Sequence, residues 1–367
     1  MTNLNHNHYN PSLSTILNMF NPYQVILLLL FLAAPIHCRR PHVINFRWPN
    51  LYPESFAWDP KSDHFVVGSL RHRQIISVSD AGIASSLLSD DSLPHDSFFA
   101  GISLDPRHHR LLAVVRRVSP PFSALASYDL RTSRQLFLAP LDDLLPSAVA
   151  ANDVAADYSG NAYVTDSASN VIFKVTEQGE ASILSTSKLF KPDAVDGSRD
   201  CGLNGVVYST KGYLLVTQSN TGKLFKVFTD DGSARRVILN KHLRAPDGIA
   251  VRRDGVVLVV SKHKLYFIKS DDSWSQGAVF DETALEEEKH ASAVAVGADS
   301  RVYVLYGNVD EGMMGKDEFS IVEVESEAEG KEENVWIFVL VGLGFAYFLF
   351  WRFQMRQLVH NMDKKHA

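Results

Sequence analysis

The chain has 367 residues, a formal net charge of −6 and 46% hydrophobic residues. This length fits one large domain or two ordinary ones. The acidic balance and the lack of a Lys/Arg stripe argue against nucleic acid as a partner, because phosphates require clustered positive charge. Only two cysteines occur, Cys38 and Cys201, which excludes a disulfide scaffold and leaves no Cys/His spacing typical of zinc.

The N-terminal segment 1–38 contains no Asp, Glu, Lys or Arg. It includes the apolar run "VILLLLFLAA" over residues 25–34, which ends shortly before Cys38 and Arg39. Ten residues span only about half of a hydrocarbon core of roughly 30 Å. The run therefore predicts a signal peptide over 1–38 rather than a spanning helix, with Met19 as an alternative start.

The two cysteines have two interpretations. If Cys38 leaves with the signal peptide, we expect Cys201 to be a small buried apolar residue. If Cys38 is retained, the two thiols could form a disulfide.

Residues 39–325 consist of short runs rich in Val, Tyr, Leu and Thr, separated by turn residues, and they lack helical periodicity. The second strand of each repeat is expected in runs such as "NAYVTD" (161–166), "YLLVTQ" (213–218) and "VVLVVS" (256–261). Third strands are expected over 170–176, 222–228 and 263–269, and fourth strands over 181–186, 235–239 and 277–281. Four strands in each repeat are typical of propeller blades.

Six similar phrases mark the start of a repeat. Their apolar anchors are spaced by 46, 52, 52, 43 and 45 residues, at Phe56, Ile102, Val154, Val206, Ile249 and Val294. These periods predict an all-β fold, a six-bladed β-propeller over 39–325. We expect "HVINF" (42–46) to pair with the last blade and close the ring, which would hide an exposed strand edge.

An oxygen-bearing side chain stands two residues before four of these anchors. The four residues are Glu54, Asn152, Asn204 and Asp247, whereas repeats two and six carry Ala100 and Ser292 there. If the repeats close into a ring, equivalent positions converge on one axis. Oxygen ligands with two negative charges suit Ca²⁺, although another divalent cation could bind. The alternative is that these residues merely form turns before strands, which explains Asn and Asp but explains Glu54 poorly.

The C-terminal segment 335–351 is an uncharged run, "VWIFVLVGLGFAYFLFW". It follows an acidic linker over 326–334 and precedes a basic tail over 352–367. This pattern predicts one transmembrane helix with a cytosolic tail and a lumenal propeller, rather than a buried core helix. Lys364 and Lys365 resemble a dilysine retrieval signal, which favours the endoplasmic reticulum membrane. Another secretory compartment or the plasma membrane is the alternative.

The phrases "PESFAWD", "NDVAADYSGNAYVTD", "LNGVVYSTKGYLLVT" and "APDGIAVRRDGVVLVV" resemble the gluconolactonase/regucalcin (senescence-marker) family and its relative diisopropyl fluorophosphatase. The blade phrases are also similar to NHL repeats. The resemblance covers roughly residues 50–310. It implies that Glu54, Asn152, Asn204 and Asp247 surround one catalytic divalent ion, typically calcium. It also implies hydrolysis of lactones or of phosphotriester-like esters.

Asp247 is the residue expected to carry the chemistry, either as a base towards water or as a direct nucleophile. The chain departs from the gluconolactonases at Ala150, where they carry an Arg that holds a polar sugar acid. This change favours a more apolar ester or lactone as the small-molecule substrate. The retained ligands argue against the condensing, strictosidine synthase-like propellers. A non-catalytic calcium-binding propeller, with a protein partner on its loops, is the alternative function.

Overall fold

The computed structural model describes residues 40–192, 201–309 and 315–366, so the signal peptide predicted over 1–38 lies outside the described residues. The side chains of 330–338, 363 and 365–366 are likewise outside the described part. The chain divides into two compact units. One is Pro41–Ser326, and the other contains the C-terminal helix α3 (Glu327–His366).

The Pro41–Ser326 unit is built from antiparallel sheets in which consecutive strands are neighbours. The first sheet has four strands, β2 (Phe56–Asp59), β3 (His64–Val67), β4 (Gln74–Ser79) and β5 (Ala84–Ser89). The second sheet contains β6 (Phe98–Asp105), β7 (Arg110–Arg117), β8 (Phe122–Asp129) and β9 (Gln135–Pro140). The third sheet contains β10 (Ala151–Ala156), β11 (Ala162–Asp166), β12 (Val171–Val175) and β13 (Ala181–Ser185). Short 3₁₀ helices lie at η1 (Asp142–Leu144), η2 (Lys188–Phe190) and η3 (Ala298–Ser300).

The next eight strands form one sheet. They are β14 (Leu203–Ser209), β15 (Tyr213–Gln218), β16 (Lys223–Phe228), β17 (Ala234–Leu239), β18 (Pro246–Val251), β19 (Val257–Ser261), β20 (Lys264–Lys269) and β21 (Gln276–Ala284). Its two halves are joined where β17 pairs with β21 in parallel through Ile238–Gln276 and Leu239–Gly277. The expected all-β, propeller-like architecture is confirmed. The expectation of six separate sheets differs from the observed four sheets of four strands and one of eight, and this short parallel pairing is the reason.

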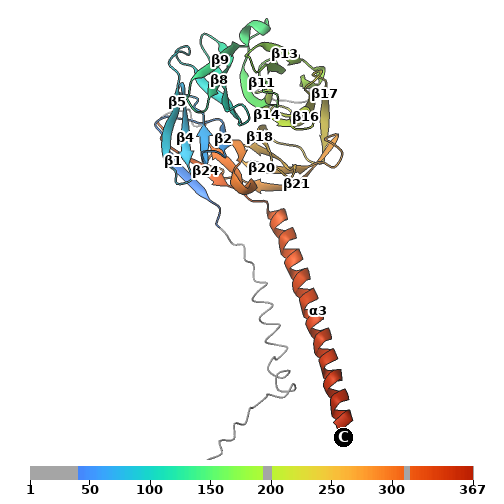
Figure 1. The fold of residues 1–367 in the computed structure, drawn as a ribbon. Coiled ribbons are helices and arrows are strands. Elements are labelled where there is room, and N and C mark those ends of the chain that lie inside the picture. The colour runs from blue at the N-terminus through green and yellow to red at the C-terminus, as the bar shows by residue number, and fades with distance from the viewer. Residues whose placement is uncertain (1–39, 193–200, 310–314, 367) are drawn as a thin grey trace, which may run out of the picture. The chain divides into compact units, whose positions relative to one another are not determined.

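The last sheet has the order β1 (Val43–Arg47), β24 (Glu318–Glu323), β23 (Val302–Tyr306) and β22 (Ala291–Val296). The N-terminal strand β1 therefore pairs with β24, with Ile44 opposite Ile321 and Phe46 opposite Phe319, as the sequence predicted. The first strands β2, β6, β10, β14, β18 and β22 contact one another in this order, and β22 also contacts β2. The sheets thus close into a ring (Figure 1).

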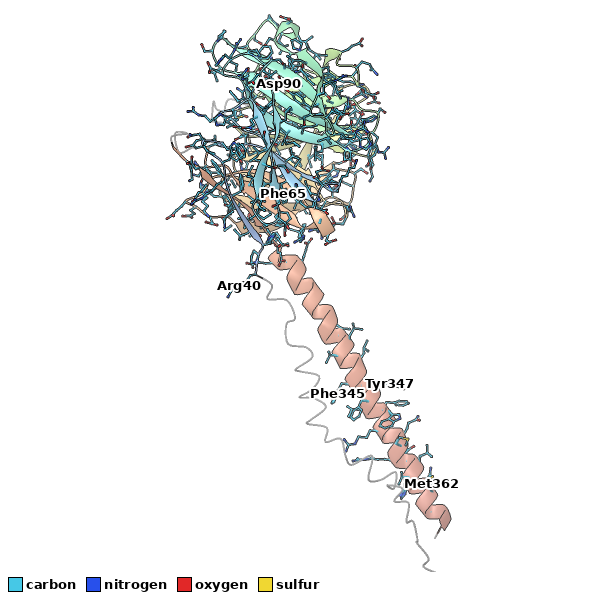
Figure 2. The ribbon with its side chains drawn as sticks, turned by 60° about the vertical axis from the view of Figure 1, so that its left-hand side comes forward. Arg40, Phe65, Asp90, Phe345, Tyr347 and Met362 are labelled. Carbon is cyan, nitrogen blue, oxygen red and sulfur yellow. The ribbon has the colours of Figure 1, made fainter. Side chains whose placement is uncertain are left out.

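The core lies between neighbouring sheets. Phe65 of β3 packs edge-to-face on Tyr303 of β23, with 5.0 Å between ring centroids, which joins the first sheet to the last. The Tyr128 hydroxyl of β8 donates to the Asp90 carboxylate at 2.8 Å, which joins the second sheet to the end of β5. Figure 2 labels Phe65 and Asp90 within these sheets. Aromatic and aliphatic burial of this kind is the main stabilising contribution to the ring.

The helix α3 contains the segment 335–351 that the sequence predicts to cross a membrane. Within the described residues, we find no helix whose apolar stretch reaches the length required to span a bilayer. Large apolar side chains of α3 are exposed, among them Leu340, Leu343, Tyr347, Phe350 and Phe353. Figure 2 labels Phe345 and Tyr347 on this helix.

The closing strand β1 gives a first prediction. Phe46 is 2% exposed and packs against Phe319, whereas Val43 on the same strand is 48% exposed. We expect Phe46→Ala to lower the free energy of unfolding by about 3–5 kcal/mol because it empties a core position. Val43→Ala should change it by less than about 0.5 kcal/mol. Denaturant unfolding measures both, and equal effects would contradict a closing role for the buried face of β1.

Candidate metal centre

The predicted ligands lie at irregularities of the first strands. In the β10–β11 pair, the register passes from Ala151–Asp166 to Val154–Val164, so Asn152 and Asp153 lie opposite the single residue Thr165. The same extra residue occurs in the first strands β14 and β18. A bulge of this kind bends the strand and redirects a side chain. The side chain of Asn152 therefore departs from the regular alternation of side chains between the two faces of the sheet, at the position predicted to bind a cation.

The bulges correct the expectation that the four residues precede their strands. Asn204 lies in β14 and Asp247 in β18, at the register shifts between Leu203 and Val206 and between Pro246 and Ile249. Only Glu54 precedes its strand, β2. The turn-forming alternative therefore does not describe Asn152, Asn204 or Asp247, which sit inside strands.

All four predicted ligands line the same two cavities. Glu54, Asn152, Asn204 and Asp247 border a channel of about 690 Å³ that runs along the first strands. They also border a mouth cavity of about 430 Å³, whose wall includes Cys201, Lys262 and His290. Because the same side chains bound both spaces, they form the boundary between channel and mouth. The structure thus brings together residues that are up to 193 positions apart in the chain.

The two amide ligands are oriented by their neighbours. Asn152 Nδ2 donates to Ser167 Oγ at 2.9 Å, and Asn204 Nδ2 donates to Ser219 Oγ, also at 2.9 Å. Both Nδ2 atoms also lie 3.6 Å from Cys201 Sγ. With the NH₂ groups used in this way, the carbonyl oxygen of each amide is the atom that a cation would meet.

Cys201 differs from the sequence-based expectation of a buried apolar residue. The residue as a whole is exposed, while its sulfur lies between the amides of Asn152 and Asn204 in the mouth cavity. Burial of the thiol raises its pKa, and the carboxylates of Asp247 and Glu54 raise it further. Cys38, the other half of the predicted disulfide, lies outside the described residues.

Asp153 follows Asn152 and is buried beside the candidate ligands. Its Oδ2 accepts a hydrogen bond from the Val206 backbone N–H at 3.0 Å, which ties β10 to β14. Burial raises the pKa of Asp153 to about 6, although this hydrogen bond opposes the shift. The corresponding position in β14 is Gly205, where a Cβ would collide with the Asp247 carbonyl oxygen. The first strands therefore approach one another closely at the site.

Hydroxyl groups at the ends of β11 and β15, which the sequence reasoning missed, connect these second strands to the next first strands, β14 and β18. Thr165 Oγ1 donates to the Asn204 carbonyl oxygen, and Thr217 Oγ1 donates to the Asp247 carbonyl oxygen at 2.9 Å. Ser167 and Ser219 donate in the same way to Leu203 and Pro246. The signal was present as "TDS" (165–167) and "TQS" (217–219), which end equivalent strands of two repeats.

Arg116 was also missed. It lines a third cavity, of about 1000 Å³, together with Glu54 and Asn152. This cavity beside two of the candidate ligands therefore has a cationic side chain on its wall. Among the described residues, no group of three or more His, Cys, Asp or Glu side chains could hold a metal ion, so a cation at this site would depend on the two amides.

No protein-family model matches the sequence, and no curated protein matches it significantly. Solved structures do match the fold. The allergen Mala s 1 of Malassezia sympodialis has a TM-score of 0.66 and 16% identity over 78% of this chain and 97% of its own. A gluconolactonase of Xanthomonas campestris has a TM-score of 0.54 and 16% identity, over 79% and 97% of the two chains.

A luciferin-regenerating enzyme matches at a TM-score of 0.54 and 12% identity, over 78% and 97% of the two chains. At such low identity these similarities show the fold alone. They confirm, at that level, the propeller expected from the resemblance to gluconolactonases.

The hydroxyl connections give a second prediction. Thr217 is fully buried and its hydroxyl also lies 3.3 Å from the Gly205 carbonyl oxygen. We expect Thr217→Val to lower the free energy of unfolding by about 1–3 kcal/mol, because it removes the buried hydroxyl that donates to the half-buried Asp247 carbonyl. Thr132→Val is the control, since that exposed threonine bonds only within its own turn. If denaturant unfolding shows the same loss of stability in both variants, the hydrogen bond from Thr217 to Asp247 does not contribute to stability.

Proposed function

We propose that the chain is a hydrolase of esters, lactones or phosphotriesters that depends on a divalent cation, with Ca²⁺ as the preferred ion. The observation that carries the proposal is the shared position of Glu54, Asn152, Asn204 and Asp247 between channel and mouth. We count six blades, because the two halves of the eight-stranded sheet each begin with a first strand of the ring and share only two residue pairs.

The donor set fits a hard cation. Two carboxylates and two amide carbonyl oxygens provide oxygen ligands only, and the serine and cysteine contacts of Asn152 and Asn204 hold the amides in place. When bound, the ion would polarise a carbonyl or phosphoryl oxygen of the substrate. Four protein ligands leave positions of a six- to eight-coordinate ion for water or substrate.

Asp247 is the proposed catalytic residue. It borders both cavities, so its carboxylate can meet a molecule that reaches the boundary from the mouth. Its role is to take a proton from the attacking water or to attack the reacting carbon or phosphorus directly. The backbone of Asp247 is held by Thr217, which limits its movement during the reaction.

One of the fold neighbours, the gluconolactonase, supports a lactone-directed reaction by its name, and a second, the luciferin-regenerating enzyme, is named as an enzyme. The second candidate function is a non-catalytic calcium-binding propeller that holds a protein partner on its loops. This function is favoured by the neighbour with a TM-score of 0.66, because that protein is named as an allergen and its name states no reaction. Loss of hydrolysis without loss of calcium binding, tested below, separates the two functions.

We further propose that α3 anchors the protein in the endoplasmic reticulum membrane, with a lumenal propeller. The support comes from the exposed apolar side chains of α3 and from the acidic residues before them and basic residues after them. Lys364 is exposed, as a retrieval signal must be.

The metal proposal predicts that Ca²⁺ raises the thermal midpoint of the purified protein, because a ligand that binds only the folded state stabilises that state. At a Ca²⁺ concentration a hundredfold above the Kd, the free energy of unfolding should rise by about 2.7 kcal/mol. Asp247→Ala should abolish most of this shift, since it removes a charge and a ligand. Asp254→Ala, at an exposed aspartate of the same repeat that pairs with Arg252, should not.

Asp247→Asn separates binding from chemistry. An amide oxygen can still serve as a ligand, whereas an amide cannot act as base or nucleophile. We expect calcium binding to persist while hydrolysis of aryl esters, lactones and phosphotriesters falls by at least about a hundredfold. Wild-type protein that neither gains stability from Ca²⁺ nor hydrolyses any of these substrates would contradict the proposed function. Binding without hydrolysis in the wild type would favour the interaction module.

The anchoring proposal predicts the outcome of protease treatment of sealed microsomes. Only the tail 352–367 should be removed, because the propeller would lie inside. Detergent, which opens the vesicles, should then expose the propeller to cleavage. Degradation of the propeller in intact vesicles would place it on the cytosolic side and overturn the topology.

A further inference from the structure

The ring of candidate ligands has a gap at the second blade. Ala100 of β6 occupies the equivalent position there, between Glu54 before β2 and Asn152 of β10 in ring order. A cavity of about 1000 Å³ is bordered by these three residues. The side chain missing at Ala100 therefore leaves the ligand ring open on one side, towards this cavity.

Arg116 projects its charge into the same cavity from β7. It is the cross-strand partner of Phe98 on β6, and its guanidinium carbon lies 5.8 Å from the centre of the Phe98 ring. Arg116 is half-buried, yet among the described residues no side chain or backbone oxygen accepts a hydrogen bond from its guanidinium. Arg110 on the same strand, by contrast, donates to Asp105 and to the Gly160 carbonyl.

A sheltered guanidinium without an acceptor is costly, because it has lost part of its hydration without a bonded partner. Burial lowers the pKa of Arg116, and the carboxylates of Asp166 and Glu54 and the Cys201 thiol act against this shift at longer range. No carboxylate of the described residues forms an ion pair with it within 4.0 Å. The guanidinium thus lies near the Phe98 ring, on a residue that lines the cavity, and has no protein acceptor among the described residues.

We propose that Arg116 binds a carboxylate of the substrate, so that the enzyme acts on esters or lactones that carry an acid group. This inference rests on the proposed function, since it assumes that the reacting bond lies at the four ligands. The planar fork of a guanidinium matches the two oxygens of a carboxylate. Arg71 and Arg117 also line the cavity, together with the acidic Glu54 and Asp96. Arg117 already donates to the Pro120 carbonyl oxygen, whereas Arg116 has no such acceptor among the described residues.

The remainder of the substrate would be apolar. Leu70, Phe98 and Val118 line the cavity around Arg116. A small aromatic or aliphatic group would cover this surface while its carboxylate reaches the guanidinium. The charge absent at Ala150 would therefore be supplied by a different strand, β7.

The binding test compares two probes of nearly the same shape, phenylacetate and the neutral 2-phenylacetamide, by titration calorimetry. The full-length protein is kept in EDTA so that the probe cannot bind to a cation instead. We expect wild-type protein to bind phenylacetate at least about tenfold more tightly than the amide, as a charge-assisted hydrogen bond allows. Arg116→Gln should remove this preference, and Arg116→Lys should keep part of it.

Arg134→Gln is the matched control, because it removes one positive charge from an exposed turn of the same sheet. It should bind phenylacetate as the wild type does. Equal affinity of the wild type for the two probes overturns the proposal, whether or not Arg116→Gln folds. Equal phenylacetate affinity in wild type and Arg116→Gln overturns it as well.

A kinetic comparison distinguishes this inference from the proposed function. With Ca²⁺ present, Arg116→Gln should raise the KM for an aryl ester bearing a carboxylate by about tenfold or more, and leave the KM for its neutral methyl-ester analogue unchanged. If neither ester is hydrolysed by the wild type, the proposed function fails, while the binding comparison still decides whether Arg116 is an acid-binding group.

Discussion

The candidate site depends on side-chain hydrogen bonds that join one first strand to the next. Neighbouring sheets of the ring share almost no backbone pairing, apart from the two residue pairs between β17 and β21. The distance between successive ligand strands is set instead by hydroxyls and one carboxylate, such as Thr165 on the Asn204 carbonyl and Asp153 on the Val206 amide. Each of these bonds ends at a bulge or beside one. The bonds that link neighbouring sheets beside the site are therefore also those that position the candidate ligands.

This arrangement explains why the bulges are tolerated. A bulge leaves backbone groups without their partners in the ladder, and such groups are costly when buried. Here the carbonyls of Asn204 and Asp247, which lie at bulges, accept hydrogen bonds from Thr165 and Thr217 of the preceding sheets. The irregularity that redirects the side chain of the candidate ligand is thus stabilised by the adjacent sheet.

Much of the fold followed from local patterns. Strand alternation and turn pairs predicted the second, third and fourth strands to within a few residues, and the apolar "HVINF" predicted the closing strand. The spacing of the repeats placed Glu54, Asn152, Asn204 and Asp247 on equivalent positions, and all four do line the same cavities. The bulges were not predictable, because an apolar anchor looks the same whether its strand begins there or three residues earlier.

Contacts between distant segments account for the rest of the site. Cys201 lies beside an amide 49 positions earlier in the chain, and nothing in its local sequence indicates this neighbour. Arg116 gains its significance only from cross-strand pairing with Phe98 and from the small residue at the ligand position of the same sheet. A single arginine in a strand would ordinarily be assigned to the surface.

The absence of a ligand side chain at Ala100 and the positive charge of Arg116 have a common physical consequence. A ring with a ligand from every blade would surround a cation on all sides within the ring and leave approach only from the channel or the mouth. Two carboxylates and two amides leave an opening at the second blade, and the cavity there has an arginine on its wall. In the proposed function, the same opening that lowers the number of protein ligands would admit a substrate, and the guanidinium would select among substrates. Coordination and specificity would then both depend on the second sheet, through Ala100 of β6 and Arg116 of β7.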